Sequence, residues 1–393
     1  MPSSDTLFVA PLLGSDDAWS GYIVKFAPGG QDNPEAVNQL CAAVLTHDFD
    51  QRQHWLIPAV LGSNLKNVLG ERAITIFPAL PAPFETEALK EYEASLRQTR
   101  CKVGLLTTPE IALPGAGAWD YLVISASHAH SLPPFTLTGL ASRCVVVATE
   151  VHSKNDRERT VNNACALSTT EFLQARQNTG KKADMSRLKL LEMLALIAED
   201  ADTAKLDAIF RQESKLSYSL LRLVNSAAVA PRNPITSFSQ AINLLGRRQL
   251  QRWLQLLVYA DPNNGQQPNP LLQKAAARGH QLELLAQHLT PLPAVENLGD
   301  AAFMVGTFSL LDALLNMSMP EILQQLPLPP IVQEALTKHI GGLGELLLAI
   351  DAAENGDFKR AANKLCALGI SSAAHREAQL ASYSWASKIR SNV

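Results

Sequence analysis

Histidines and nearby carboxylates are the residues of this sequence best suited to chemistry. His128 and His130 lie two positions apart in the stretch SASHAH, so they would point to the same side of an extended segment. Asp120 precedes them, and Glu150 follows the next apolar run. Imidazole and carboxylate groups together can bind a transition metal. The alternative is structural, because isolated histidines such as His152 are usually surface or core residues.

The second half of the chain offers fewer candidates. His280 and His288 fall on roughly one face of a helix, without a third ligand in view. Arg247, Arg248 and Arg252 form a basic cluster that could meet a phosphate group or nucleic acid. The cluster lacks interleaved aromatic residues, so a solvated helix face is the favoured interpretation.

Composition limits the classes of protein to consider. The chain has 393 residues, 34 Lys and Arg against 37 Asp and Glu, and a net charge of -3, so nucleic acid is not expected as the main partner. We see no apolar run approaching about 18–20 residues and no basic N-terminal region followed by an apolar core, so we expect a cytoplasmic protein without a membrane span. The 5 cysteines lack CxxC spacing, which favours reduced, buried thiols.

The first part of the chain alternates short apolar strands with helical segments. We expect helices at 34–45 and 85–98. The predicted strands are 7–13, 22–26, 55–59, 73–77, 103–106, 121–124 and 145–149. Parallel neighbours need crossover helices, so this order predicts an α/β barrel or sheet with parallel strands, about the length of a short barrel.

A polar stretch at 174–184, QARQNTGKKAD, marks the predicted domain boundary. Beyond it the apolar spacing predicts an all-helical domain, with Asn269 and Pro270 starting one of the helices. The expected helices are 186–199, 203–212, 217–225, 237–245, 248–259, 270–289, 300–315, 331–339, 343–354, 358–367 and 372–389.

Residues 217–246, SYSLLRLVNSAAVAPRNPITSFSQAINLLG, form the most distinctive stretch. Asn225 and Ser226 end one helix and are expected to satisfy backbone groups there. Ser237 and Gln240 predict a capping box for the next helix, and Gly246 suits a left-handed C-cap. We therefore predict a structural hub in this stretch.

This stretch closely resembles the signature of the HDOD domain, an all-helical bacterial signalling module related to HD phosphohydrolases. The helix LLRLVNSA and the later ITSFSQAINLLG occur in order at the family's spacing. The segments AFMVGTFSLLDALL, LPL and GGLGELL further along resemble the C-terminal extension of EAL-HDOD proteins.

The first half in turn resembles the EAL phosphodiesterases, α/β barrels that hydrolyse cyclic di-GMP with metal ions held at strand ends. GYIVKFA, residues 21–27, is similar to the family's G-Y-E-L-L-F-R strand. DYLVIS, residues 120–125, and ATEVHS, residues 148–153, are similar to two further strands of the motif. The resemblance implies a barrel followed by an HDOD domain over nearly the whole chain.

The departures from the EAL motif argue against catalysis. Ile23, Thr149 and His152 stand where the motif has glutamates. Ala27 replaces its arginine, Val123 its lysine and Ser125 its aspartate. The motif's Asp-Asp pair would lie within 106–108, where there is no carboxylate. Magnesium and manganese need hard, mostly anionic oxygen ligands, so the resemblance implies a degenerate barrel.

The helical half also lacks the ligands of an HD enzyme. Active members need a His-Asp pair, and the only such pair here is His47-Asp48, in the other domain. The helix ARGHQLE resembles the HDOD helix that replaces the metal-binding one, and its Gln281 cannot supply an anionic ligand.

We therefore predict two domains, a degenerate EAL-like α/β barrel at 1–180 and an all-helical HDOD domain with a C-terminal extension at 181–393. The expected function is non-catalytic bacterial signal transduction through contacts with other signalling proteins, with no cofactor or bound metal. One alternative is a cyclic di-GMP receptor that binds without hydrolysis, and another is a metal-dependent phosphodiesterase. The identity of the partners, the pathway and homodimer formation stay open. The expected hub or docking residues are Asn225, Ser226, Ser237, Gln240, Gly246, Arg247 and Arg248.

Overall fold

The chain forms two compact units in the computed structural model. One contains Met1–Ala175 with Asp351–Cys366, and the other contains Arg176–Ile350 with Ala367–Val393. The structure describes residues 6–27, 33–60, 67–79, 87–115, 117–176, 220–221, 224–225, 234–259, 269–326 and 328–389. The predicted boundary after residue 180 and the predicted helices at 186–199 and 203–212 lie outside these ranges.

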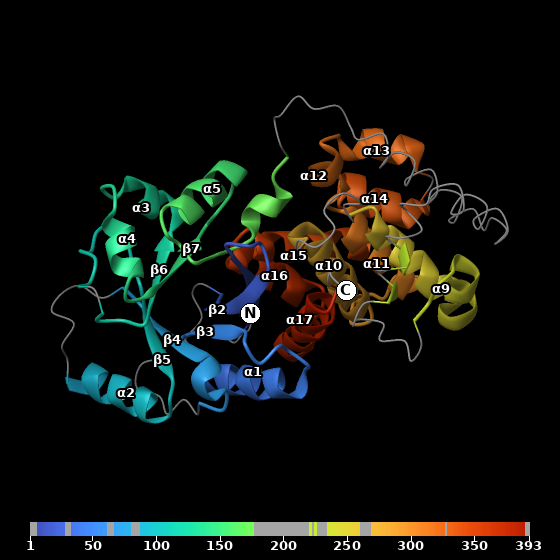
Figure 1. Cartoon of the computed structure of the whole chain (residues 1–393). Coiled ribbons are helices and arrows are strands. Elements are labelled where there is room, and N and C mark those ends of the chain that lie inside the picture. The colour runs from blue at the N-terminus through green and yellow to red at the C-terminus, as the bar shows by residue number, and fades with distance from the viewer. Residues whose placement is uncertain are drawn as a thin grey trace. The chain divides into compact units, whose positions relative to one another are not determined.

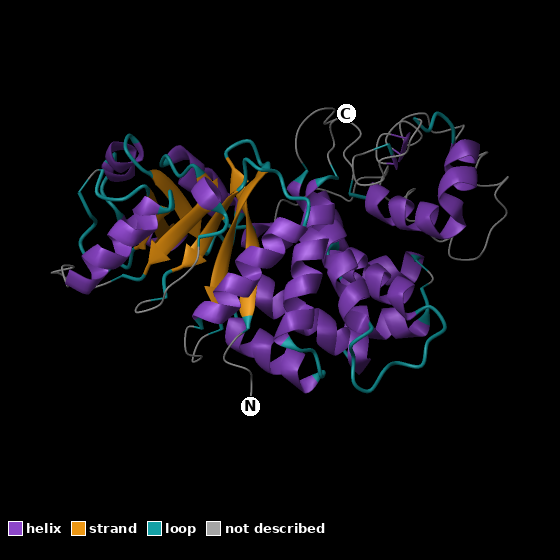
Figure 2. Cartoon of the chain, turned by 90° about the horizontal axis from the view of Figure 1, so that it is seen from below, coloured by secondary structure: helices purple, strands orange, loops and turns teal. Residues whose placement is uncertain are grey.

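The first unit is built on a closed barrel with strand order β1-β2-β3-β4-β5-β6-β7-β8 (Figures 1 and 2). The predicted α/β barrel is therefore confirmed. Its strands are β1 (Leu7–Gly14), β2 (Trp19–Phe26), β3 (His54–Pro58), β4 (Ala73–Phe77), β5 (Lys102–Leu106), β6 (Tyr121–Ser125), β7 (Val145–Thr149) and β8 (Leu167–Ser168). The short strand β8 was not among the predicted ones.

One strand of the barrel departs from the predicted parallel arrangement. Strands β2 to β8 pair in parallel, whereas β1 is antiparallel to both β2 and β8. Residues 15–18 join β1 to β2, and a connection this short permits only a hairpin. The sequence shows the short connection, but not that β1 also closes the barrel against β8.

Helices connect the parallel strands on the outside of the barrel (Figure 2). The predicted helices at 34–45 and 85–98 are present as α1 and α2. Asn33 caps α1 by accepting a hydrogen bond from the Glu35 N–H at 2.9 Å. The helices between strands are α1 (Pro34–Thr46), η1 (Gly70–Arg72), α2 (Glu87–Gln98), α3 (Ala126–Ser131), α4 (Thr136–Ala141) and α5 (Lys154–Asn162). The short helix η2 (Glu171–Gln174) follows β8, and no described helix lies between β5 and β6.

Arg157 on α5 ties the ends of the barrel sheet together. Its buried guanidinium donates to the carbonyl of Gly14, to Asp17 Oδ1 at 2.9 Å and to Ser168 Oγ at 3.0 Å. The first two acceptors lie at the β1–β2 turn, and the third lies on β8. This side chain therefore fixes the two strands whose antiparallel pairing closes the barrel.

A C-terminal segment completes the packing of the barrel unit. Phe358, at the start of α16 (Phe358–Ala367), stacks on Phe8 of β1 with ring centroids 5.1 Å apart. Gln174 Nε2 donates to Glu354 Oε2 at 2.9 Å, at the end of α15 (Gly341–Glu354). The barrel unit is therefore discontinuous along the chain.

Every regular element described in the second unit is a helix (Figure 1). The helix at 217–225 is described only at residues 220–221 and 224–225. The remaining helices are α9 (Phe238–Leu257), α10 (Pro270–Ala286), α11 (Leu298–Phe308), α12 (Leu311–Leu315), α13 (Met319–Gln325), α14 (Pro330–Lys338) and α17 (Ser372–Ser387), with most of α15. Asn269 caps α10 as predicted, accepting from the Leu272 N–H at 3.0 Å.

Some helices differ from the predicted ones by more than their end residues. The helix predicted at 300–315 is divided into α11 and α12, and α13 was not predicted. The stretch Leu298–Leu315 is long and apolar enough to cross a membrane by length and composition, although the sequence showed us no such run. It is 72% buried, as expected of a helix in a protein core.

Two glycines bring α10 and α11 into close contact. A Cβ atom added to Gly306 would lie 2.6 Å from the Arg278 carbonyl oxygen and 2.7 Å from the Gly279 Cα. Both of these atoms belong to the backbone, which cannot rotate away as a side chain can. The two helices can therefore pack at this distance only while position 306 lacks a side chain.

Gly306→Ala should reduce the free energy of unfolding of the helical unit by about 1–3 kcal/mol, because it overpacks the α10–α11 contact. Gly299→Ala on the same helix is the control, since its added Cβ would meet only side-chain atoms, the nearest at 3.6 Å. Urea denaturation followed by circular dichroism would measure both. Equal effects of the two changes would contradict the proposed close contact.

His375 on α17 makes the fold sensitive to acid. Complete burial lowers the pKa of this imidazole from 6.5 to about 3, so the folded protein holds it neutral. Below the ordinary pKa the unfolded chain binds the proton more strongly, and stability falls with decreasing pH. The expected loss is about 1.4 kcal/mol for each pH unit below about 6.

Denaturation of the wild type and His375→Gln between about pH 7 and pH 4 would measure this contribution. The variant should lose less stability on acidification than the wild type, whatever its stability at neutral pH. Parallel pH dependences of the two proteins would show that His375 is not responsible.

Candidate functional site

The positions that match the EAL catalytic motif lie mostly inside the packed barrel. Ile23 and Val123 belong to the apolar core cluster, with relative exposures of 4% and 0%. Thr149 at the end of β7 is also buried, and its hydroxyl donates to the Ile124 carbonyl at 3.5 Å. Apolar side chains fill the space around Ile23 and Val123. The full cluster is Leu12, Ile23, Leu56, Ile74, Tyr121, Val123, Val147 and Leu167.

The other matching positions serve the backbone. Ser125 Oγ accepts a hydrogen bond from the His128 N–H at 3.2 Å and so caps α3. Thr107, in the segment where the Asp-Asp pair was expected, donates from its hydroxyl to the Val123 carbonyl at 3.1 Å. Ala27 is buried, and its N–H donates to the Thr6 carbonyl at 3.2 Å. Each contact holds a strand end in place.

The two closely spaced histidines do not form the side-by-side pair expected of an extended segment. The segment is the helix α3, so residues two apart point in different directions, and that expectation was wrong. His128 is buried, and burial lowers the pKa of its imidazole. Burial also lowers the pKa of His130, whose Nδ1 lies 3.8 Å from Asp156 Oδ1. Both shifts favour the neutral rings.

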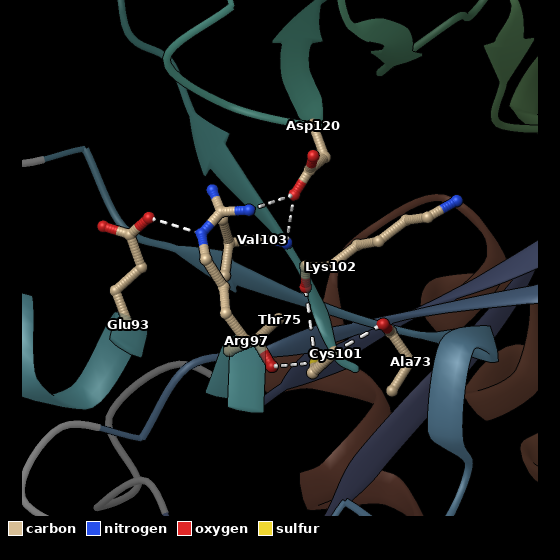
Figure 3. A network of polar contacts seen from close by, with 8 residues as sticks. All are labelled: Ala73, Thr75, Glu93, Arg97, Cys101, Lys102, Val103 and Asp120. Atoms are coloured by element: carbon tan, nitrogen blue, oxygen red, sulfur yellow. Dashed lines mark hydrogen bonds and ion pairs between the residues drawn. The ribbon is translucent and has the colours of Figure 1, made fainter. Parts of the chain in front are cut away.

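The carboxylates proposed to join these histidines lie elsewhere. Asp120 Oδ2 accepts hydrogen bonds from Arg97 at 3.2 Å and from the Val103 N–H at 3.0 Å (Figure 3). Glu150 is exposed and has a positive φ of 59°. Among the described residues, no group of three or more His, Cys, Asp or Glu could hold a metal ion. The role of His152, which is exposed, stays open.

The Asp120 network is a structural clamp between α2, β5 and β6. Arg97 Nε also donates to Glu93 Oε1 at 2.8 Å, and Glu93 lies four residues earlier on α2. Cys101 lies beside this clamp, and its thiol contacts Thr75 Oγ1 at 3.2 Å and the Ala73 carbonyl at 3.4 Å (Figure 3). Burial raises the pKa of Cys101, which keeps it a thiol and agrees with the expectation of inert cysteines.

Asn225 is the centre of the hub expected in the helical half. Its Nδ2 donates to the Leu221 and Ile235 carbonyls, and its Oδ1 accepts from the Ile235 N–H, all at 2.7 Å. One side chain thus joins the end of the preceding helix to the segment before α9. The contacts are backbone contacts, as the sequence predicted for this position. Ser226 lies outside the described residues.

The predicted capping box at Ser237 forms in part. Ser237 Oγ accepts from the Gln240 N–H at 3.1 Å, as predicted. Gln240 Oε1, however, accepts from the N–H and the hydroxyl of Thr236, at 2.8 and 3.0 Å, and not from the Ser237 N–H. The glutamine side chain thus accepts from two donors of the residue that precedes Ser237. The second contact of the predicted capping box, from Gln240 back to the Ser237 N–H, was therefore wrong.

Gly246 interrupts α9 but does not cap it. Its φ of 75° is positive, as predicted, whereas its ψ of 159° is far from the left-handed helical region. Helical hydrogen bonding continues past the kink to Leu257. The prediction of a left-handed C-cap was therefore wrong, while the need for glycine at this position holds, because this conformation is essentially restricted to glycine.

The basic residues after Gly246 are paired with acids. Arg252 is largely buried and contacts Glu283 Oε1 at 2.6 Å and Asp300 Oδ1 at 2.7 Å. Arg248 pairs with Asp300 as well. The favoured interpretation of a solvated face therefore does not hold for Arg252. The side chain of Arg247 lies outside the described set.

The acids of this network could not be identified from sequence spacing. Glu283 lies on α10 and Asp300 on α11, 31 and 48 residues from Arg252. Burial alone would raise the pKa of Glu283, but hydrogen bonds and charges from His280 and Arg252 lower it overall. His280 Nδ1 lies 3.3 Å from Glu283, so this histidine belongs to the same network. The network links helices and has no excess of positive charge for a phosphate.

Comparisons with known proteins agree with this architecture. Residues 188–291 match the family described as HDOD domain. This match follows the eight-stranded barrel, so the predicted order of an α/β barrel followed by an HDOD domain is confirmed.

Two curated proteins match part of the chain. Cyclic di-GMP phosphodiesterase CdgJ of Vibrio cholerae is 31% identical over 190 residues, which cover 48% of this chain and 43% of the relative. Uncharacterized protein YuxH of Bacillus subtilis is 28% identical over 166 residues, 42% of this chain and 39% of the relative. The matches thus span less than half of either relative.

Two solved structures are also similar. The FimX EAL domain of Xanthomonas citri in complex with c-diGMP is 13% identical with a TM-score of 0.32, covering 42% of this chain and 85% of that one. The Bacillus subtilis YkuI protein, with an EAL domain, in complex with c-di-GMP and calcium, is 13% identical with a TM-score of 0.34, covering 62% and 74%.

Asn225→Ala should destabilise the helical unit by about 2–4 kcal/mol, because it removes the hydrogen-bond partner of both the N–H and the carbonyl of Ile235. Asn225→Asp, of the same shape, should cost at least as much, since a carboxylate would face two carbonyl oxygens. Asn243→Ala, at an exposed position of α9, is the control and should be nearly neutral. Urea denaturation would measure all three, and a neutral Asn225→Ala would disprove the hub.

Proposed function

We propose that this chain acts in bacterial cyclic di-GMP signalling as a non-catalytic protein that binds other signalling proteins through its HDOD domain. The observation that carries the proposal is the apolar packing of Ile23 and Val123, at positions where the EAL motif has a glutamate and a lysine. Divalent metal ions need anionic oxygen ligands, and a packed apolar interior supplies neither charge nor room for a hydrated ion.

The link to cyclic di-GMP comes from the relative named a cyclic di-GMP phosphodiesterase, 31% identical over 190 residues. That name also supports the second candidate, a receptor that binds cyclic di-GMP without hydrolysing it. A metal-dependent phosphodiesterase is the third candidate. The first is preferred because the positions matching the motif are used for packing and strand-end hydrogen bonds.

The purified full chain should not hydrolyse cyclic di-GMP in the presence of manganese or magnesium, since the described residues of the barrel include no carboxylate cluster that could bind these ions. Chromatographic detection of the linear product would measure this, with a chelator-treated sample as the background. Manganese-dependent turnover that the chelator abolishes would establish the phosphodiesterase. Ile23→Glu is a useful second variant: in a packed core it should lower stability without producing activity.

Calorimetry with cyclic di-GMP separates the first two candidates. Submicromolar binding by the full chain would favour the receptor over the protein-binding function. If the protein-binding function is correct, a partner captured from a native lysate by both the full chain and residues 181–393 should also bind the full chain when that partner is purified. If no captured protein binds the full chain after purification, the protein-binding function is rejected.

A further inference from the structure

A group of hydrogen-bond donors lies at the N-terminal end of the barrel, away from the strand ends discussed above. His54 begins β3, Arg72 directly precedes β4, Lys102 begins β5 and Tyr121 begins β6. These strands are consecutive in the barrel and parallel, so their first residues meet at the same end. The barrel thus carries four donor side chains around one part of its mouth.

The pairing of the strands turns three of these side chains towards the barrel axis. Lys102 pairs directly with Ile74, a core residue, and paired residues share a face of the sheet. His54 lies two residues before Leu56, also in the core, so it faces the same way. Tyr121 itself belongs to the core cluster, and its hydroxyl lies 3.4 Å from His54 Nδ1.

The charges at this end are not balanced. Burial lowers the pKa of His54, and the positive charges of Lys102 and Arg72 lower it further, so both cations act on the imidazole. Asp50 also acts on Arg72, but its carboxylate is bound by Arg52 at 2.7 and 3.1 Å. Positive charge therefore remains in excess near His54.

Asp120, which adjoins Tyr121, is occupied as well. It accepts from Arg97 and from the Val103 N–H, as described above. Figure 3 shows the Lys102 side chain extending away from this network, with its ammonium group at a distance from the Asp120 carboxylate. Asp120 therefore does not neutralise Lys102.

At this end, Arg72 Nη2 and the Lys102 ammonium have no acceptor among the described residues. Arg72 Nε donates to the Gln53 carbonyl at 3.3 Å and Nη1 to Gln51 Oε1 at 3.0 Å, which fixes the guanidinium, while its buried Nη2 has no partner. The Lys102 ammonium makes no hydrogen bond or ion pair within the described part of the chain. A buried donor without an acceptor costs free energy that a bound anion would recover.

We propose that His54, Arg72, Lys102 and Tyr121 form a binding site for a phosphate group at the N-terminal mouth of the barrel. Arg72 and Lys102 supply the charge, and the imidazole and phenol supply neutral donors. Burial, with Asp120 nearby, raises the pKa of Tyr121 to about 12, so its hydroxyl keeps its proton. Several donors on different strands suit a tetrahedral oxyanion, whose oxygens point in different directions.

This inference does not depend on the proposed function. The site lies at the strand starts, whereas the positions matching the EAL motif lie towards the strand ends. A failure of the phosphate site in the experiment below would therefore leave the proposed function untouched, and a failure of the proposed function would leave the phosphate site untouched. The phosphate could be inorganic or part of a phosphate monoester, and the two sources can be distinguished by titration.

Calorimetric titration of the full chain with inorganic phosphate and with glycerol phosphate, at constant ionic strength, tests the site. Saturable binding is expected, and Lys102→Met and Arg72→Gln should each weaken it about tenfold or more. Lys359→Met, an exposed lysine on α16, is the matched control and should bind as the wild type does. Tighter binding of the ester would identify a phosphorylated metabolite as the ligand, and equal or weaker binding would identify free phosphate.

Histidine-selective NMR locates the bound anion. Phosphate should raise the pKa of His54 in the wild type, because a neighbouring anion stabilises the imidazolium, and this response should vanish in Lys102→Met. Absence of saturable binding, equal affinity in all variants, or a His54 pKa that ignores phosphate would each overturn the proposal. Unfolding curves of the variants would confirm that each is folded during the titrations.

Discussion

The apolar filling of the barrel is the constraint on which the rest of the first unit depends. An eight-stranded barrel closes only when the inward side chains fill its interior. Here Leu12, Leu56, Ile74 and Val147 do so together with Ile23 and Val123. Catalytic EAL chemistry would place charged groups at the last two positions. The proposal that this chain is non-catalytic therefore rests on the same side chains that stabilise the fold.

Polar side chains have a different task in this protein, which is to fix elements in place. Arg157 joins the β1–β2 turn to β8, and the Arg97–Asp120 pair joins α2 to the adjacent strands. In the helical unit Asn225 holds two segments together, and Arg252 links α9 to α10 and α11. Nearly all these groups are satisfied within the fold. Such contacts specify one packing arrangement, since breaking any of them leaves a polar group without a partner.

Local features were predictable from the sequence where one short segment determines them. The strands β1 to β7, the Asn269 cap and the interruption at Gly246 follow from apolar spacing and from the conformations that asparagine and glycine allow. Features that need distant partners were not predictable. The strand β8 has only 2 residues, and its place is set by pairing with β1 and β7. The partners of Arg252 are likewise fixed by helix packing and not by spacing.

The same distinction explains the errors at the candidate site. His128 and His130 were grouped because an extended chain would align them, but Ser125 starts a helix at that point, and its cap is visible only once the strand end is placed. Conversely, Lys102 and His54 are 48 positions apart and attracted no attention in the sequence. They meet because parallel strands begin at one end of the barrel.

The interior of the barrel and its N-terminal mouth consequently differ in the charge they can hold. A charged group inside the apolar core would have to give up its hydration without compensation, which costs several kcal/mol. At the mouth, Lys102 is exposed, so its ammonium keeps much of its water and costs little to place there. Arg157 is buried but paired with Asp17, whereas an unpaired positive charge such as that of Lys102 is kept where solvent reaches it. Any anion that the barrel binds must then approach through the mouth, with its outer oxygens still hydrated.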